Sequence, residues 1–170
     1  MGFKKTSEVI AISNRIEESA ANTFTEQQYN LNLDALNNEV FVVLAIDAAP
    51  STPDFIPGTN TADRFQLSST SQTAITGLET SNVLLRVERT IQSPTSGSGD
   101  SSILSEQRDA ESVQAVLDYI AVIATDNFFA QIEGAGNNNV MACAFRMWGY
   151  RAKADAATYA ALVQSEVLSS

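Results

Sequence analysis

The segment that most constrains the fold of this chain is residues 118–154, close to the C-terminus. It contains three apolar runs separated by the polar stretches TDN and GAGNNN: DYIAVIATDNFFAQIEGAGNNNVMACAFRMWGYRAKA. Glycine and asparagine tolerate the positive φ angles of tight turns, so both polar stretches are predicted to be turns. The segment is therefore predicted to form three consecutive β-strands.

The preceding part of the chain extends this pattern. Four more runs are predicted to be strands or to contain them: YNLNLD (29–34), EVFVVLAID (39–47), RFQLSSTSQTAIT (64–76) and VLLRVERTI (83–91). Roughly seven or eight strands thus follow one another, with mostly turns and few helices between them. This order argues against a doubly wound α/β sheet. It predicts a mainly β fold, an antiparallel β-sandwich, with a single jelly roll as its specific form.

Two of the connecting segments are predicted to be less regular. Residues 92–102, QSPTSGSGDSS, have the composition of an exposed loop. Residues 109–117, DAESVQAVL, are predicted to be either a short helix capped by Asp109 or the beginning of a strand.

Two further helices are predicted, one near each end of the chain. Apolar residues recur at intervals of three and four in residues 7–20, which indicates a short amphipathic helix, with an extended arm as the alternative. In residues 155–167, Asp155 is a suitable N-cap for a helix whose apolar face contains Tyr159, Leu162 and Val163. The predicted organisation is an N-terminal arm or helix (1–23), a β-sandwich (24–153), and a C-terminal helix and tail (154–170).

Two of the predicted strands are apolar on both faces. Both alternating sets of side chains are apolar in residues 39–47, and the same holds for residues 141–150. A strand of this kind lies between two layers, under a loop, or against a neighbouring subunit. The residues predicted for core packing or subunit contact are Phe41, Val43, Phe145, Trp148, Tyr150 and Tyr159.

The chain has few groups suited to catalysis or to holding a cofactor. It has no histidine, and its one cysteine, Cys143, lies in an apolar run where a buried thiol is expected. Acids near strand ends could in principle pair for glycoside hydrolysis or bind calcium, but they follow no metal-binding spacing: Asp47, Asp63, Asp118, Asp126 and Glu133. We therefore predict no catalytic residue, no cofactor and no metal ligand, and a protein that is not an enzyme.

The charge balance constrains the partners. The chain has 20 acidic and 10 basic residues, and its net charge of −10 disfavours binding in the grooves of nucleic acids. The adjacent basic pair Lys4 and Lys5 is a candidate contact for an anionic membrane or a genome, with a solvated tail as the alternative. We recognise neither a signal peptide nor an apolar run of transmembrane length, so synthesis in a cytoplasm is expected.

The segment IAVIATDNFFAQIEG, the glycine-asparagine turn after it, and VMACAFRMWGYRAKADAATYAALVQ together resemble a known family. They are similar to the closing strands and C-terminal segment of small single jelly-roll capsid proteins. That family comes from tailless icosahedral viruses of bacteria and archaea, some of which have an internal membrane. The resemblance covers mainly residues 118–168, with looser support from the N-terminal strands.

The resemblance implies a shell subunit without enzymatic activity, made in the host cytoplasm and located in the virion. Its partners would be copies of itself, other capsid proteins and an internal membrane reached through the N-terminus, with no sequence-specific nucleic-acid binding. Other capsid groups have a strongly basic arm for the genome, which is reduced here to Lys4 and Lys5. The alternative function is a carbohydrate-binding or adhesive β-sandwich, with Trp148 and Tyr150 exposed in a shallow groove.

Overall fold

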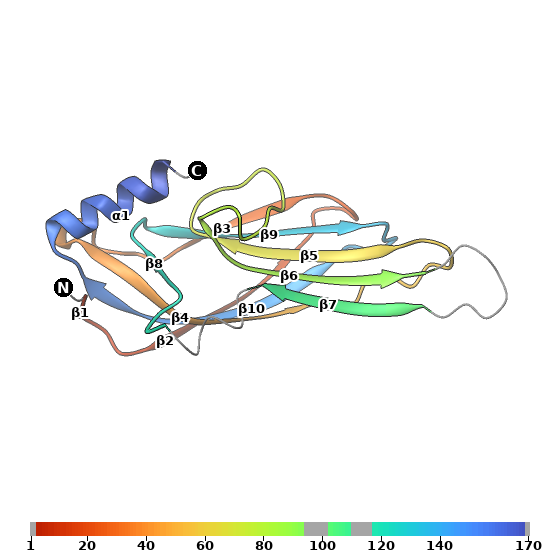
Figure 1. Cartoon of the computed structure of the whole chain (residues 1–170), viewed down its shortest axis with the longest axis horizontal. Coiled ribbons are helices and arrows are strands. Elements are labelled where there is room, and N and C mark those ends of the chain that lie inside the picture. Colours follow the sequence, from red (N-terminus) through yellow and green to blue (C-terminus); the bar gives the residue numbers. More distant parts are fainter. Residues whose placement is uncertain (1–2, 94–101, 110–116, 169–170) are drawn as a thin grey trace.

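A computed structural model describes residues 3–93, 102–109 and 117–168, and it shows two antiparallel β-sheets packed face to face (Figure 1). Sheet A contains, in spatial order, β2 (Ile10–Glu17), β10 (Ala142–Lys153), β4 (Glu39–Pro50) and β8 (Ala121–Ile123), and the short β1 (Lys4–Lys5) also pairs with β10. Sheet B contains β3 (Thr25–Asn30), β9 (Asn127–Ala135), β5 (Thr61–Ser68), β6 (Val83–Gln92) and β7 (Ile103–Asp109). The 3-10 turn η1 (Ala35–Asn37) precedes β4, and helix α1 (Ala156–Leu168) follows β10.

The strand order is that of a jelly roll. The chain crosses repeatedly between the sheets, from β2 in sheet A to β3 in sheet B and back to β4, and finally from β9 to β10. The sheet β2-β10-β4-β8 therefore faces β3-β9-β5-β6, while β7 extends sheet B beyond β6. This is the winding of two Greek keys around one core. The predicted mainly β class, antiparallel sandwich and single jelly roll are confirmed.

The inner faces of the two sheets meet in an aromatic core. The rings of Tyr29 and Phe128 from sheet B are stacked, with centroids 5.3 Å apart. Phe145 from sheet A lies edge-on to Tyr29 at 5.4 Å and is stacked on Phe65 at 5.6 Å. Edge-to-face and offset ring contacts stabilise beyond the apolar area that they bury, so this cluster helps to fix the position of one sheet on the other.

Helix α1 lies at the end of the sandwich where the chain begins (Figure 1), and it packs on the side of β4 that faces away from the core. Val40 and Val42 of β4 point away from the core into a second, smaller apolar cluster, which α1 completes with Tyr159, Leu162 and Val163. The Asp155 carboxylate accepts the backbone N–H of Thr158 at 2.9 Å, which confirms the predicted N-cap. β4 is apolar on both faces because it lies between two layers.

The helix predicted for residues 7–20 is wrong, because this region contains a strand of sheet A. β2 pairs with β10 from Ile10 opposite Gly149 to Glu17 opposite Ala142. Ile12 and Ile16 both pack in the main core. An interval of four residues returns to the same face of a strand as well as to the same side of a helix, so the spacing did not distinguish the two. Residues 10–17 therefore belong to the sandwich and not to a separate arm.

Other boundaries also differ from the predicted ones. The strand predicted at 29–34 is at Thr25–Asn30, and the Ser/Thr-rich strand ends at Ser68, after which residues 69–82 form a loop. β7 was not predicted, because ILSEQRD is mostly polar and shows no alternation. The loop expected at 92–102 and the helix or strand expected at 109–117 fall largely on residues outside the described ranges.

Candidate subunit-contact surface

Three of the six residues predicted for packing or subunit contact lie in the main core. Phe41, Val43 and Phe145 are 1%, 0% and 3% exposed, and all three face sheet B. They are packing residues of the folded chain. They present no surface to a neighbouring copy.

Tyr150 and Tyr159 are half-buried on the opposite side of sheet A. Both belong to the apolar cluster beneath α1. The Lys5 ammonium lies 5.5 Å from the centroid of the Tyr150 ring, a cation–π distance. Trp148 and Tyr150 share a strand face as predicted, but the exposed aromatic pair expected of a sugar-binding groove is not formed, because Tyr150 is half-buried in the second apolar cluster.

Besides its apolar contacts, α1 is hydrogen-bonded to the sandwich through the side chain of Glu166. Glu166 is 6% exposed, and its carboxylate oxygens accept the backbone N–H groups of Ala124 at 3.0 Å and Thr125 at 2.9 Å, just after β8. The Asn82 side chain donates to the Glu166 carbonyl oxygen at 3.3 Å. Burial raises the pKa of Glu166, while the hydrogen bonds from residues 124 and 125 act in the opposite direction. Sequence reasoning missed this residue, because a lone acid near a helix end is usually solvent-exposed.

Replacing Glu166 by Ala is expected to lower the free energy of unfolding by about 2 kcal/mol, because two backbone N–H groups lose their acceptor in a buried position. Urea denaturation measures the loss, and limited proteolysis shows whether α1 has been released. Glu166→Gln retains one acceptor oxygen and is expected to lose about half as much. Gln164→Ala, at an exposed site of the same helix, is the control and should leave stability unchanged. A Glu166→Ala protein as stable as this control would show that the buried contacts do not hold the helix.

Trp148 borders a shallow hollow on the uncovered part of the outer face of sheet A. The hollow has a volume of about 250 Å³, and its lining comes from β2, β4 and β10 and includes Ser13, Asp47, Ala49, Ala144 and Arg146. The Arg146 guanidinium lies 5.7 Å from the indole centroid and donates through Nε to Ser13 Oγ at 2.8 Å. Of the six predicted contact residues, five pack in apolar clusters, whereas Trp148 borders an open surface.

The predicted membrane or genome contacts Lys4 and Lys5 lie on the sheet and not on a free tail. In β1, Lys4 is opposite Lys153 and Lys5 is opposite Ala152 of β10. Both side chains are exposed, and Lys5 also forms an ion pair with Glu8 at 3.2 Å. Contact of these lysines with a membrane or a genome stays a prediction.

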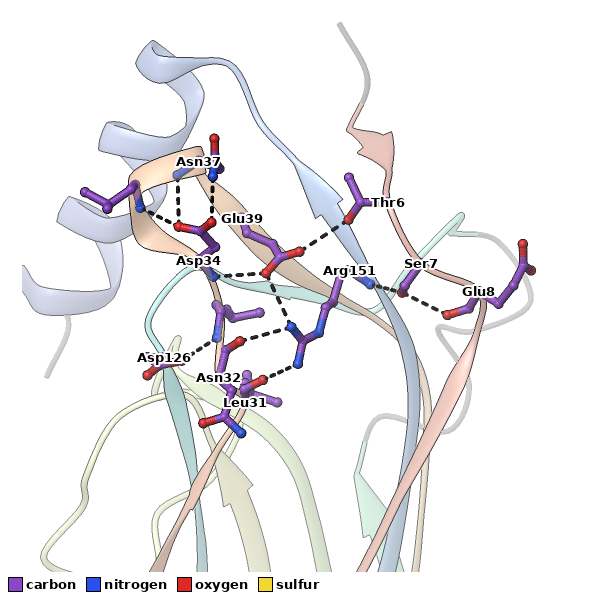
Figure 2. A network of polar contacts seen from close by, with 12 residues as sticks. Thr6, Ser7, Glu8, Leu31, Asn32, Asp34, Asn37, Glu39, Asp126 and Arg151 are labelled. Atoms are coloured by element: carbon purple, nitrogen blue, oxygen red, sulfur yellow. Dashed lines mark hydrogen bonds and ion pairs between the residues drawn. The ribbon is translucent and has the colours of Figure 1, made fainter.

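Arg151 braces the end of the sandwich next to α1, as Figure 2 shows. Its guanidinium donates to the carbonyl oxygens of Leu31 at 2.8 Å and Asn32 at 3.0 Å, and it lies 3.5 Å from the Glu39 carboxylate. Glu39 accepts the backbone N–H of Asp34 at 2.9 Å. The network thereby connects the last strand, the start of β4 and the turn between β3 and β4, and it holds η1 in place.

Large apolar side chains are exposed away from the Trp148 hollow as well. Leu36 of η1 is 96% exposed, Phe55 in the β4–β5 loop is 61% exposed, and Leu168 at the end of α1 is 74% exposed. None of them was among the predicted contact residues. The sequence contains no signal for them, because single apolar residues in loops and at helix ends are common on protein surfaces.

The acids noted near strand ends do not converge on a site. Asp126 accepts the backbone N–H of Leu33, and Asp47 pairs with Arg108 at 3.1 Å. Within residues 3–93, 102–109 and 117–168, no three His, Cys, Asp or Glu side chains are grouped as metal ligands are. Asp63 differs from the other acids, because it is completely buried on the inner face of β5.

Cys143 has the role expected of it. The thiol is buried in the core, and burial, with the nearby Asp63 charge as a second cause, raises its pKa. A buried thiol with a raised pKa is a poor nucleophile. In the part of the chain that the structure describes, no helix is both long and apolar enough to cross a bilayer.

The fold and these surfaces define a single jelly-roll protein whose sheet A is partly open. The sequence matches no protein-family model, and it matches no curated protein. Among solved structures, the chain is similar to one from Desmodium yellow mottle tymovirus, with 13% sequence identity, a TM-score of 0.29, and coverage of 86% of this chain and 86% of that chain. At this TM-score the likeness supports no functional argument.

Proposed function

We propose that this chain is a structural capsid protein that self-assembles into the shell of a tailless icosahedral virus of bacteria or archaea. The observation that carries the proposal is the strand order, β2-β10-β4-β8 against β3-β9-β5-β6. This winding is used by viral capsid and lectin domains. The capsid family that residues 118–168 resemble is built on it as well.

The exposed surface supports assembly from many copies. Contacts between different patches on successive copies generate rings and closed shells. Exposed apolar side chains suit such contacts, and they occur in η1 at Leu36 and in the β4–β5 loop at Phe55, while the half-buried Trp148 borders the hollow. In this proposal the protein is located in the virion and its partners are copies of itself and other capsid proteins. Lys4 and Lys5 then face an internal membrane where one is present, and no nucleic-acid sequence is read.

Assembly of the purified full chain tests the proposal directly. Light scattering after size-exclusion chromatography, with electron microscopy, is expected to show rings or shells at raised protein concentration and ionic strength. Leu36→Glu and Phe55→Glu are expected to weaken assembly by about tenfold or more without loss of fold, because both side chains are exposed in the single chain. Gln27→Glu, at an exposed position of β3, adds the same charge and is the control. A strictly monomeric protein under all these conditions would contradict the proposal.

A carbohydrate-binding or adhesive module is the competing function. The hollow beside Trp148 has polar side chains at Asp47 and Arg146, but Tyr150 packs in the second apolar cluster and does not line the hollow. Glycan binding by a monomeric chain, abolished by Trp148→Ala, would replace the capsid proposal with this one.

A further inference from the structure

Asp63 and Arg89 lie directly opposite one another on β5 and β6, yet the structure shows no ion pair between them. Directly opposite residues of antiparallel strands have Cβ atoms about 5 Å apart on the same face, so the guanidinium is within reach of the carboxylate. Arg89 is turned elsewhere instead. Its Nη1 donates to the carbonyl oxygen of Pro50 at the end of β4, and its Nε pairs with Glu106 on β7. The carboxyl group opposite it has no counterion.

Asp63 itself lies in the core, and only one of its two carboxyl oxygens accepts a hydrogen bond. The residue is 0% exposed, and Ser51 Oγ donates to Oδ2 at 2.9 Å, whereas Oδ1 has no hydrogen-bond partner in the described part of the chain. An ionised carboxylate is costly in such a place, and a neutral acid is much less so. Burial raises the pKa of Asp63 to about 7. The group therefore exchanges its proton near neutral pH.

Two other titratable groups face Asp63, and neither supplies a positive charge. Glu18, from the turn after β2, adds a negative charge, and its oxygens accept the backbone N–H groups of Gly134 at 2.6 Å and Met141 at 2.7 Å. Cys143, from β10, has a buried thiol whose pKa is raised, so it stays neutral in the relevant pH range. If Asp63 ionises, the positive charge that balances its carboxylate must come from an arginine.

Among the described residues, Arg89 and Arg108 are the arginines whose charges act on Asp63 or on the neighbouring Cys143. Arg108 of β7 is shared between Asp47 at 3.1 Å and Glu106 at 2.6 Å. Arg89 is the cross-strand partner of Asp63, and its charge already acts to lower the pKa of that carboxyl, after the larger effect of burial. Arg89 can thus reach Asp63 by rotating its side chain while Arg108 keeps Glu106 paired.

We propose that Arg89 is a two-position switch that responds to the protonation of Asp63. With Asp63 neutral, Arg89 holds the Pro50 carbonyl and Glu106, as in this structure. When Asp63 loses its proton, the guanidinium turns inward, because a charge-assisted bond to the buried carboxylate replaces one to a neutral carbonyl, while Glu106 stays paired with Arg108. The attachments to Pro50 and Glu106 are then released. Protonation in the core thereby sets how firmly β7 and the start of the β4–β5 loop are held, whether or not the chain assembles into a shell.

Crystal structures of the full chain at about pH 5.5 and about pH 8.5, on either side of the Asp63 titration, test the switch. At the lower pH, Arg89 is expected on Pro50 and Glu106. At the higher pH it is expected on Asp63 in the wild type but not in Asp63→Asn. Arg89 in one position at both pH values in the wild type would overturn the proposal, and so would a movement that Asp63→Asn shares.

A titration of the Asp63 carboxyl carbon by NMR separates the switch from a simple charge effect. Glu106→Gln removes the group that competes for Arg89, so the midpoint for Asp63 is expected to fall by about one pH unit. Glu88→Gln is the matched control, because it removes the same charge but pairs with Arg64 at 3.1 Å and Arg86 at 2.6 Å and not with Arg89. Equal midpoints in the two variants would mean that only through-space charge is at work, and the switch would be rejected.

Discussion

Replacing Asp63 by Asn is expected to raise the free energy of unfolding at pH 8 by about 2 to 4 kcal/mol. Asn retains the Ser51 hydrogen bond and cannot ionise, so the folded chain no longer has the charge of residue 63 buried in its core. The upper value is the difference between the usual pKa of an aspartate and the value of about 7 in the folded chain, at about 1.4 kcal/mol per unit. The lower value allows for the Asn amide N–H groups, which find no acceptor where Oδ1 stood.

The pH dependence of this gain distinguishes ionisation from a change in packing. Below about pH 4 the carboxyl is protonated in both states, and the wild type has its full stability. As the pH rises from about 4 to about 7, the unfolded chain releases the proton while the folded chain keeps it, so the wild type loses stability across that window. The difference between Asp63→Asn and the wild type therefore grows over the same window and is constant above it. Urea denaturation at a series of pH values measures it, and a difference that does not change with pH would contradict the prediction.

Asp54, in the β4–β5 loop, is a control because its pKa is shifted in the opposite direction to that of Asp63. Its carboxylate accepts from the side chain and the backbone N–H of Asn139 and from the backbone N–H of Asn138, and these hydrogen bonds lower its pKa. The stabilisation is present above the usual aspartate pKa and is lost as the pH falls through the lowered value. Asp54→Asn is therefore expected to be less stable than the wild type at pH 7 and equally stable in strong acid.

Replacing Gly149 by Ala is expected to lower the free energy of unfolding by about 2 to 3 kcal/mol. A Cβ atom at this position would lie 2.4 Å from the carbonyl oxygen of Val42 and 2.5 Å from the Phe41 ring. β10 is the strand between β2 and β4, and the pairing with β4 shifts register between Trp148 and Gly149. The added methyl group meets backbone as well as a buried ring, so neither neighbour can move away without disturbing the sheet. Thermal or urea denaturation gives the loss.

A double-mutant cycle with Phe41→Leu identifies the cause. Removing the ring relieves one of the two clashes, so Gly149→Ala should cost less in the Phe41→Leu background than in the wild type. An equal cost in both backgrounds would assign the effect to the Val42 carbonyl alone. A stability change of less than about 0.5 kcal/mol would show that the crowding at Gly149 is absent in solution.

Much of the fold could be predicted from local pattern. The alternation in residues 118–154, with its glycine and asparagine turns, predicted β8, β9 and β10, and Asp155 predicted the start of α1. The failures occurred where local pattern is ambiguous. The four-residue interval of Ile12 and Ile16 fits both a strand and a helix, and β7 pairs with β6 although its sequence shows no alternation.

For the candidate subunit-contact surface, the sequence predicted which side chains need a packing partner, but not which partner each one has. Periodicity identified both apolar faces of residues 39–47 and 141–150, since alternation along a strand depends on neighbouring residues alone. It could not say what covers each face. Phe41 and Phe145 meet sheet B, Tyr150 packs in the apolar cluster that α1 helps to form, and Trp148 borders open surface.

The sequence by itself therefore determined an antiparallel sandwich without histidine chemistry, because strand period, turn residues and composition are local properties of the chain. Only the tertiary structure decided which acids are buried. Glu166 accepts backbone N–H groups some forty residues earlier in the sequence. Asp63 lies between sheets, opposite an arginine that is engaged elsewhere. The free energy of a carboxyl group depends on the solvent and charges around it, and in a jelly roll those surroundings come from strands that are distant in the sequence.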